Sequence, residues 1–249
     1  MSEHLPELYT SLADWFHLLT RPEEYAQEAA YFRDLLLSTS RIPVKSVLEL
    51  GCGGGNNASH LKQHFQLTLT DLSAQMLHLS SSINPDCEHI QGDMRTLRLG
   101  RLFDAVFIHD AICYMTNLPD LREAIETAFV HCRQGGVSIF APDFTRETFQ
   151  EATSHGGHDG QQRSLRYLEW TWDPEPQDDT YLVDFAYLLR DEKGEVRAIS
   201  DRHRLGLFSR ATWLETIQGV GFEARAVPYP LNDATQETAE IYLGIKPAD

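Results

Sequence analysis

The stretch that decides the fold is VLELGCGGGNN, residues 47–57, in which a short apolar run leads directly into glycines. Such a run is typical of a buried strand that ends in a tight turn. Glycine suits that turn because the backbone bends sharply and approaches a ligand with no Cβ in between. The stretch therefore predicts a strand, a glycine turn and a helix, with a ligand bound at the turn.

Two common phosphate-binding motifs fit these glycines poorly. In the dinucleotide fingerprint G-x-G-x-x-G, counted from Gly51, the third glycine falls on Asn56. A phosphate-binding P-loop needs Gly-Lys-Ser/Thr, which does not follow Gly55. An NAD-type oxidoreductase is therefore a disfavoured alternative.

Further short apolar runs follow at the spacing of βαβ units and predict an α/β fold, a parallel sheet with helices on both faces. The runs are residues 44–50, 66–71, 87–93, 103–110 and 135–143. After Phe144 the pattern changes: a loop holding His155 and His158 leads into three segments that we expect to form antiparallel strands. These segments are residues 163–172, 180–190 and 195–208. A helix then begins with Ser209 as its N-cap, and two strands complete the chain.

We expect a single domain over residues 1–249. Apolar residues at every third or fourth position, Tyr9 and Phe16 among them, predict that residues 1–40 are helical. Residues 41–144 form the ligand-binding core, residues 145–204 an antiparallel β insertion, and residues 205–249 a C-terminal helix and strands that complete the core.

Five motifs then occur in a fixed order. They are E-x-G-x-G-x-G at residues 49–55, Asp71 at the end of LTLTD, QGDMR at 91–95, FDAVFIHD at 103–110 and RQGGV at 133–137. In this order they resemble the class I S-adenosylmethionine-dependent methyltransferases. The resemblance implies a Rossmann-like class I methyltransferase fold, a seven-stranded and mostly parallel sheet whose last strand is antiparallel. S-adenosyl-L-methionine is then the cofactor, bound at the carboxyl ends of the strands.

The resemblance also implies roles for residues at the glycine turn and beyond. Glu49 interacts with the amino group of the cofactor, Asp71 with the ribose hydroxyls and Asp93 with the adenine amino group. Asp71 has a structural alternative as a helix N-cap, for which Ser73 also qualifies, and Asp93 has one as a turn residue. The full set of expected cofactor-binding residues is Tyr9, Phe16, Glu49, Gly51, Cys52, Gly53, Gly55, Asn56, Asp71, Leu72, Met76, Asp93, Met94, Arg95 and His109.

Three further segments, residues 25–29, 92–95 and 203–222, resemble a small-molecule branch of this family. That branch includes N,N-dimethyltransferases of nucleotide-linked amino sugars, in which a tyrosine of the N-terminal helix approaches the methyl group. Phe16 stands at that position here and lacks the hydroxyl.

The expected reaction is in-line transfer of a methyl group to an N or O nucleophile of a small molecule. Candidate catalytic residues are His109, Asp110 and Tyr114, because His109 could accept a proton at neutral pH and Asp110 could orient it. His109 could equally only line the cofactor pocket. Candidate substrate-binding residues are Arg166, Trp170 and His203. A cofactor-binding regulatory protein without turnover is the alternative from another class.

Composition limits the partners. With 21 Lys and Arg against 37 Asp and Glu, the net charge of −16 argues against nucleic-acid binding. The N-terminus lacks a signal-peptide pattern, no apolar run is long enough to cross a membrane, and the four cysteines form no C-x-x-C pair. We therefore expect a cytoplasmic protein with no membrane partner. We expect no metal site, because the histidines of HGGH lack the usual ligand spacing. The insertion could also mediate a homodimer.

Overall fold

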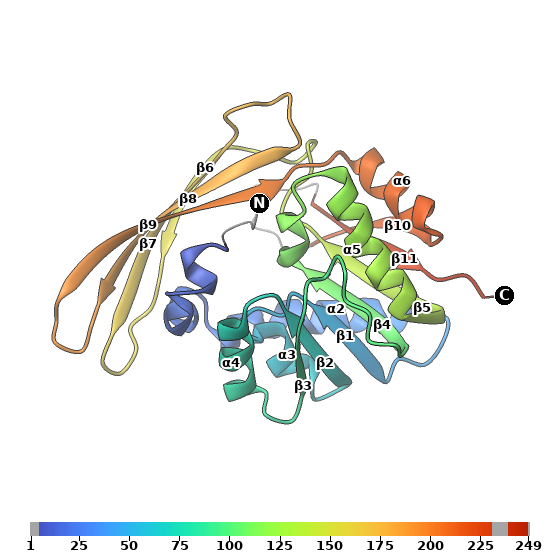
Figure 1. Cartoon of the computed structure of the whole chain (residues 1–249), viewed down its shortest axis with the longest axis horizontal. Helices are drawn as coiled ribbons and strands as arrows, with labels where there is room; N and C mark the ends of the chain where they lie inside the picture. Colours follow the sequence, from blue (N-terminus) through green and yellow to red (C-terminus); the bar gives the residue numbers. More distant parts are fainter. Residues whose placement is uncertain (1–4, 231–238, 249) are drawn as a thin grey trace.

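The computed structural model describes residues 5–230 and 239–248 and contains a central sheet of seven strands (Figure 1). The strands lie in the order β10-β11-β5-β4-β1-β2-β3. Every pair is parallel except the two that involve β11, which is antiparallel to both neighbours. Their bounds are β1 Ser46–Leu50, β2 Gln66–Asp71, β3 Glu88–Gln91, β4 Phe103–His109, β5 Cys132–Ala141, β10 Glu223–Pro228 and β11 Glu240–Ile245. The expected seven-stranded sheet with an antiparallel last strand is confirmed.

Helices cover both faces of this sheet. They are α2 Ala26–Thr39, α3 Asn56–Leu61 and α4 Ala74–Ile83 on one face, and α5 Leu118–His131 and α6 Arg210–Val220 on the other. Neighbouring residues of β1 point to opposite faces, so Val47 packs in the cluster of Phe32 and Leu48 in the cluster of Trp213. Burial of side chains of this size contributes roughly 1.5–3 kcal/mol each. With both faces covered, the ends of the strands are the places left for a ligand.

The helix ends follow the local sequence. The Ser209 hydroxyl accepts a hydrogen bond from the Thr212 amide and caps α6, as expected, and Gly221 ends the helix in the left-handed conformation. In the part of the chain that the structure describes, no helix is long and apolar enough to cross a membrane.

A second, four-stranded antiparallel sheet follows the core and has the order β6-β7-β8-β9. Its strands are β6 Ala152–Gly156, β7 Ser164–Trp172, β8 Thr180–Arg190 and β9 Val196–Gly206. Three of them match the expected strands. The loop expected around His155 is wrong in part, because residues 152–156 form β6 and pair with the open edge of β7. An available strand edge decides this segment more strongly than its own weak β propensity.

The N-terminal segment differs from the expectation of regular helices. Before α2 it is broken into η1 Glu7–Tyr9, η2 Ala13–Trp15, α1 Phe16–Leu19 and η3 Pro22–Tyr25. Its apolar side chains Leu8, Leu12 and Trp15 pack on Leu165 and Tyr187 of the second sheet. Figure 1 shows this blue segment between the two sheets. Short turns also place apolar side chains on a sheet, so the apolar period alone does not require one helix.

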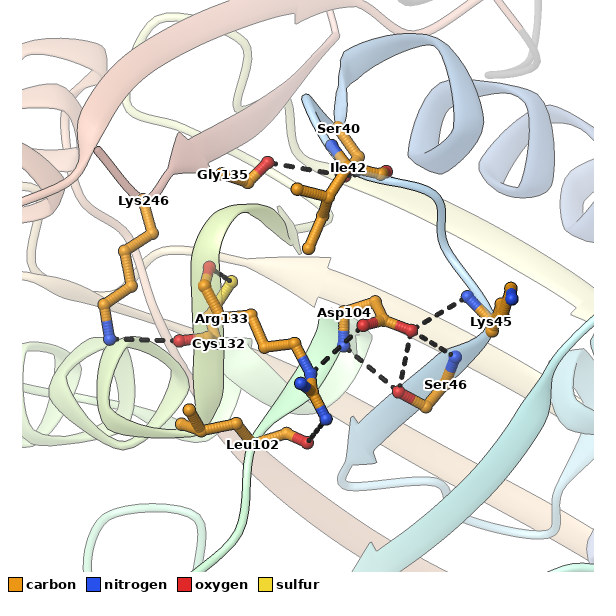
Figure 2. A network of polar contacts seen from close by, with 10 residues as sticks. All are labelled: Ser40, Ile42, Lys45, Ser46, Leu102, Asp104, Cys132, Arg133, Gly135 and Lys246. Atoms are coloured by element: carbon orange, nitrogen blue, oxygen red, sulfur yellow. Dashed lines mark hydrogen bonds and ion pairs between the residues drawn. The ribbon is translucent and has the colours of Figure 1, made fainter. Parts of the chain in front are cut away.

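At the amino-terminal ends of the strands of the central sheet, polar contacts join neighbouring strands (Figure 2). Asp104 Oδ2 accepts hydrogen bonds from the backbone amides of Lys45, at 3.0 Å, and Ser46, at 2.9 Å. Arg133 Nε lies 3.1 Å from Asp104 Oδ1, and its guanidinium also donates to the Leu102 carbonyl. These bonds tie the beginnings of β1, β4 and β5 together. The predicted site residues of the central sheet, such as Asp71 and His109, lie at the opposite, carboxyl ends of the strands, where open α/β sheets bind ligands.

Candidate active site

The glycine turn after β1 has the shape that only glycine allows. Gly51, Gly53 and Gly55 have φ angles of 75°, 52° and 80°, in the left-handed region that side chains disfavour. A Cβ on Gly51 would lie 2.3 Å from the Cβ of Ala111. At Gly53 the nearest atoms to such a Cβ are 3.9 Å away. The turn is therefore packed at Gly51 and open at Gly53, where a ligand can approach the backbone.

Glu49 carries an unsatisfied oxygen beside this turn. The residue is 4% exposed, and its Oε2 has no hydrogen-bond partner among the described residues. Burial raises the pKa of Glu49 to about 8; nearby His109 opposes this shift, while Asp71 and Glu28 add to it. A buried carboxyl without a partner is costly, and an incoming ammonium group would satisfy it. The side chain fits the role expected toward the cofactor amino group.

Asp71, at the end of β2, faces the same turn. Its Oδ2 accepts a hydrogen bond from the Gly53 amide at 2.9 Å, and its Oδ1 accepts from the Ser73 amide at 2.8 Å. Ser73, and not Asp71, is the N-cap of α4, since its hydroxyl accepts from the Met76 amide. Leu72 is exposed, and the Met76 methyl carbon is one of the two atoms nearest to the open side of Gly53.

Asp93 is engaged by its own neighbour. It accepts a hydrogen bond from the Arg95 amide at 2.9 Å and forms an ion pair with the Arg95 guanidinium at 2.7 Å. Arg95 also pairs with Asp120 at 2.8 Å. The Met94 methyl carbon lies 3.0 Å from the position of a Cβ on Gly51. Met94 therefore lies on the glycine turn, while the contacts of Asp93 are those of its structural alternative, a turn residue.

His109, at the end of β4, lies between two carboxylates. Its Nε2 is 3.4 Å from Glu28 Oε2 and 3.1 Å from Asp110 Oδ1. Burial by itself lowers the pKa of His109, but the charges of Asp110 and Glu28 outweigh it and raise the pKa to about 10. Burial raises the pKa of Glu28, but His109, Asn57 and Tyr229 together lower it to about 2. His109 is therefore an imidazolium at neutral pH.

Asp143 joins this group from the segment after β5. Its Oδ2 lies 3.5 Å from the Tyr181 hydroxyl, and the charge of Asp110 is close enough to affect its pKa. Asp110 and Asp143 are both exposed at the surface of the site, but the surrounding protein partly desolvates their carboxyls, which raises the pKa of each. For Asp143, the charge of Asp110 raises the pKa further. A neighbouring carboxylate disfavours the charged form of Asp143, and a cation bound beside the two would favour it.

A second polar group links the N-terminal segment to the second sheet. The hydroxyls of Tyr9 and Tyr114 are 2.9 Å apart, and the Tyr114 hydroxyl lies 2.7 Å from His203 Nδ1. On its other side, His203 Nε2 is 3.2 Å from Asp201 Oδ2. The Asp201 carboxylate also accepts hydrogen bonds from the amides of Glu7 and Leu8. Three predicted residues are thus brought together with Asp201, which was not among the candidates.

The N-terminal segment also covers the glycine turn. A Cβ on Gly54 would lie 2.6 Å from the ring of Phe16, and His17 Nε2 is 3.2 Å from the Gly54 carbonyl. Cys52 and Asn56 are buried in the same turn, and the Asn56 side-chain oxygen has no partner among the described residues.

Arg166 and Trp170 do not join the other candidates. Side chains alternate along β7, so Leu165 and Tyr167 face the N-terminal segment while Arg166 and Trp170 face the other side of the sheet. Arg166 pairs there with Asp159 at 3.0 Å. The substrate-binding role expected for these two residues finds no support in this geometry.

Three residues that sequence reasoning did not select belong to the site: Glu28, Asp143 and Asp201. Glu28 lies in one segment that carried the family resemblance, residues 25–29, and Asp201 lies two residues before the candidate His203. The histidines of HGGH lie apart from the site: His155 is on β6, and His158 pairs with Glu24 at 3.0 Å. Within residues 5–230 and 239–248, no group of three or more His, Cys, Asp or Glu side chains is arranged as metal ligands.

The fold and the glycine-turn site define a class I methyltransferase, and comparison with known proteins agrees. Residues 47–136 match the family model described as "Methyltransferase domain". A dTDP-3-amino-3,4,6-trideoxy-alpha-D-glucopyranose N,N-dimethyltransferase of Streptomyces venezuelae is 29% identical, over 86% of this chain and 89% of its own. These findings support an S-adenosylmethionine-dependent methyltransferase, and neither the oxidoreductase nor the regulatory alternative is favoured.

Two solved structures resemble the whole chain. Streptomyces venezuelae DesVI has a TM-score of 0.83 and 26% identity, covering 95% of this chain and 98% of that one. The sugar N-methyltransferase KedS8 from Streptoalloteichus sp ATCC 53650 also has a TM-score of 0.83 and 26% identity, covering 100% and 96%. The likeness therefore includes the second sheet and the N-terminal segment as well as the methyltransferase core.

Proposed function

We propose that the methyl acceptor is the amine of a nucleotide-linked amino sugar and that the enzyme methylates this amine twice. The observation that carries the proposal is the group of carboxyls, Glu28, Asp110 and Asp143, at the carboxyl end of β4 and β5. Such a group attracts a cationic amine and repels a carboxylate acceptor. The names of the similar N,N-dimethyltransferase and of KedS8 support the same substrate class.

For the cofactor we propose the roles that the resemblance implied. Glu49, with its unpartnered Oε2, takes the amino group, and Asp71 takes the ribose hydroxyls. Asp93 takes the adenine amino group and keeps Arg95 as its second partner. The bound cofactor supplies an electrophilic methyl group on a sulfonium. The protein contributes mainly by alignment and by exclusion of water.

Within the acceptor site we propose that Asp110 and Asp143 hold the substrate ammonium. The charge of Asp110 disfavours ionisation of Asp143 in the free enzyme, and an incoming cation would offset this repulsion. His109 is already positively charged, so its role is to balance Glu28 and Asp110 and to hold them in place.

We propose that residues 1–40 act as a lid on the cofactor and that residues 145–204 cover the acceptor. Phe16 and His17 lie on the glycine turn, and the same segment packs on the second sheet, which supports one cover built from both parts. Residues 41–144 and 205–249 then form the catalytic core.

We also propose a homodimer that uses the outer face of the second sheet. This face carries large apolar side chains that are about half exposed, and a symmetric dimer buries one such patch against its copy. They are Leu168, Trp170, Leu188 and Val196. The net charge supports a protein without a nucleic-acid partner, and four free cysteines suit the reducing cytoplasm. Light scattering on wild type and Trp170→Asp tests the dimer: equal masses contradict this interface.

An acceptor comparison tests the substrate class. Purified enzyme with S-adenosylmethionine is given a nucleotide-linked 3-amino sugar or the matched 3-hydroxy sugar, and release of S-adenosylhomocysteine is followed. We expect turnover of the amine alone and, in Asp110→Asn, a raised KM for it because one carboxylate is lost. Turnover of the hydroxy sugar alone would contradict the proposal.

A further inference from the structure

The reaction needs a proton acceptor, because an alkyl amine is protonated at neutral pH and has no lone pair to react. His109 cannot serve, since its pKa of about 10 leaves it already protonated. The group formed by Tyr114, His203 and Asp201 contains a second histidine with a hydroxyl against its ring. These three side chains lie near the site carboxylates Glu28, Asp110 and Asp143, because Tyr114 and Asp110 belong to the same short helix, η4 Asp110–Tyr114.

The contacts of His203 suit a ring that carries hydrogen on Nε2. Nε2 faces the Asp201 carboxylate at 3.2 Å, so Nε2 carries hydrogen and donates. Nδ1 is then an acceptor, and the Tyr114 hydroxyl at 2.7 Å donates to it. The side chains of His203 and Asp201 are 4% and 5% exposed, so water does not compete for these bonds. Asp201 is itself held by the amides of Glu7 and Leu8.

We propose that Tyr114, His203 and Asp201 form a proton relay that removes the proton from the acceptor ammonium before each methyl transfer. The proposal rests on an amine acceptor. In serine hydrolases the nucleophilic serine hydroxyl is hydrogen bonded to a histidine that a carboxylate orients. Here the Tyr114 hydroxyl takes the place of that serine hydroxyl, and its role is to pass on a proton. The Tyr114 hydroxyl has two acceptors in reach, the Tyr9 oxygen at 2.9 Å and His203 Nδ1 at 2.7 Å; in the relay its hydrogen lies on the shorter contact, to His203, and its oxygen accepts from the substrate nitrogen.

The relay balances at each step. The ammonium gives its proton to the Tyr114 oxygen as the Tyr114 hydrogen moves to His203 Nδ1, and the electron pair of the N–H bond stays on nitrogen. This lone pair then forms the bond to the methyl carbon, and the electron pair of the breaking C–S bond stays on sulfur. The imidazolium of His203 is stabilised by Asp201 and returns its proton to solvent through Tyr114 after product release. Double methylation uses the relay twice.

Among the described residues, the hydrogen-bond and ring contacts of His203 on the site side of the sheet include no cation. Tyr9 from η1, Tyr114 from η4 and Asp201 from β9 face it directly, and Phe185 from β8 packs on its ring. The charged pair Asp184 and Arg202 lies on the opposite face of the second sheet. Burial raises the pKa of Tyr114 far above its usual value, so a free tyrosinate does not form and the two proton movements are coupled.

The pH profile of kcat with the amino sugar tests the relay. At pH 7, Tyr114→Phe and His203→Gln are expected to slow turnover on the order of 10²–10⁴-fold, the usual contribution of general base catalysis. The loss should disappear above the pKa of the amine itself, roughly pH 8–10, where solvent supplies the neutral amine. A structural defect would slow turnover equally at every pH. The matched control is Tyr187→Phe, which removes a buried hydroxyl without a partner among the described residues.

Each outcome decides the proposal. A loss that is the same at all pH values, no loss at pH 7, or a pH-rescued loss in Asp110→Asn instead would overturn the relay. If the wild type methylates a hydroxyl and no amine, the proposed function fails, which is a different result. Nitrogen NMR of wild-type His203 needs no variant: a bare Nδ1 and a protonated Nε2 support the relay, and the reverse tautomer contradicts it.

Discussion

Cofactor binding should depend on pH through Glu49. Its pKa of about 8 means that the side chain is mostly protonated at pH 7, whereas an ion pair with the ligand ammonium needs the carboxylate. Binding must then release a proton, about 0.9 per ligand at pH 7 by two-state titration. The same relation makes affinity about ninefold tighter at pH 7 than at pH 6, or ~1.3 kcal/mol. A glutamate with an ordinary pKa would give no change over this range.

Calorimetric titration with S-adenosylhomocysteine in two buffers of different ionisation enthalpy measures both the affinity and the released proton. Glu49→Gln is the matched variant, because its neutral amide cannot titrate. We expect weaker binding by this variant, with the pH dependence removed. A wild-type affinity that is flat between pH 6 and pH 7, or a dependence that persists in Glu49→Gln, would refute the reasoning.

Three other variants, one of them with a matched control, examine the site and its support. Asp71→Ala should weaken binding of S-adenosylhomocysteine by about 1–3 kcal/mol, and an unchanged affinity in a folded variant contradicts the ribose role. Gly51→Ala should abolish binding of S-adenosylhomocysteine, because the added carbon would clash with Ala111. The control Gly100→Ala is also at positive φ but has nothing within 4 Å of the added carbon, so it should bind normally and lower the unfolding free energy by only about 1–2 kcal/mol. Equal effects of the two variants on binding would exclude the steric explanation. Glu28→Gln should lower the His109 pKa from about 10, as followed by NMR, and an unchanged titration would refute the pairing. The His109 pKa lies above its unfolded value of about 6.5, so the charged His109 stabilises the folded protein fully below about pH 6.5. This stabilisation is lost as the pH rises through about 10, and it should be smaller in Glu28→Gln.

The central sheet was predictable from sequence because its strands are short apolar runs at βαβ spacing. The N-terminal segment was not, since the same apolar period fits a helix or a series of short turns. The choice depends on the second sheet, against which Leu8 and Trp15 pack. Strand β6 likewise depends on the open edge of β7 and has no clear pattern of its own.

The glycine turn and Asp71 at the end of β2 could also be located from the sequence, because each lies within a single short motif. Glu28, Asp143 and Asp201 could not, because each enters the site from a different element and contacts residues remote in sequence. Trp170 shows a further limit. Apolar and aromatic residues occupy both faces of β7, so the sequence alone does not tell which of them faces the site.

The most direct test of the account follows the methyl group itself. The enzyme is incubated with S-adenosylmethionine labelled with ¹³C in its methyl group and with a nucleotide-linked amino sugar, and the product is examined by NMR and mass spectrometry. We predict labelled carbon on the amine nitrogen, with two methyl groups added after prolonged reaction. Labelled carbon on a sugar oxygen, or no labelled product while S-adenosylhomocysteine binds normally, would contradict the account.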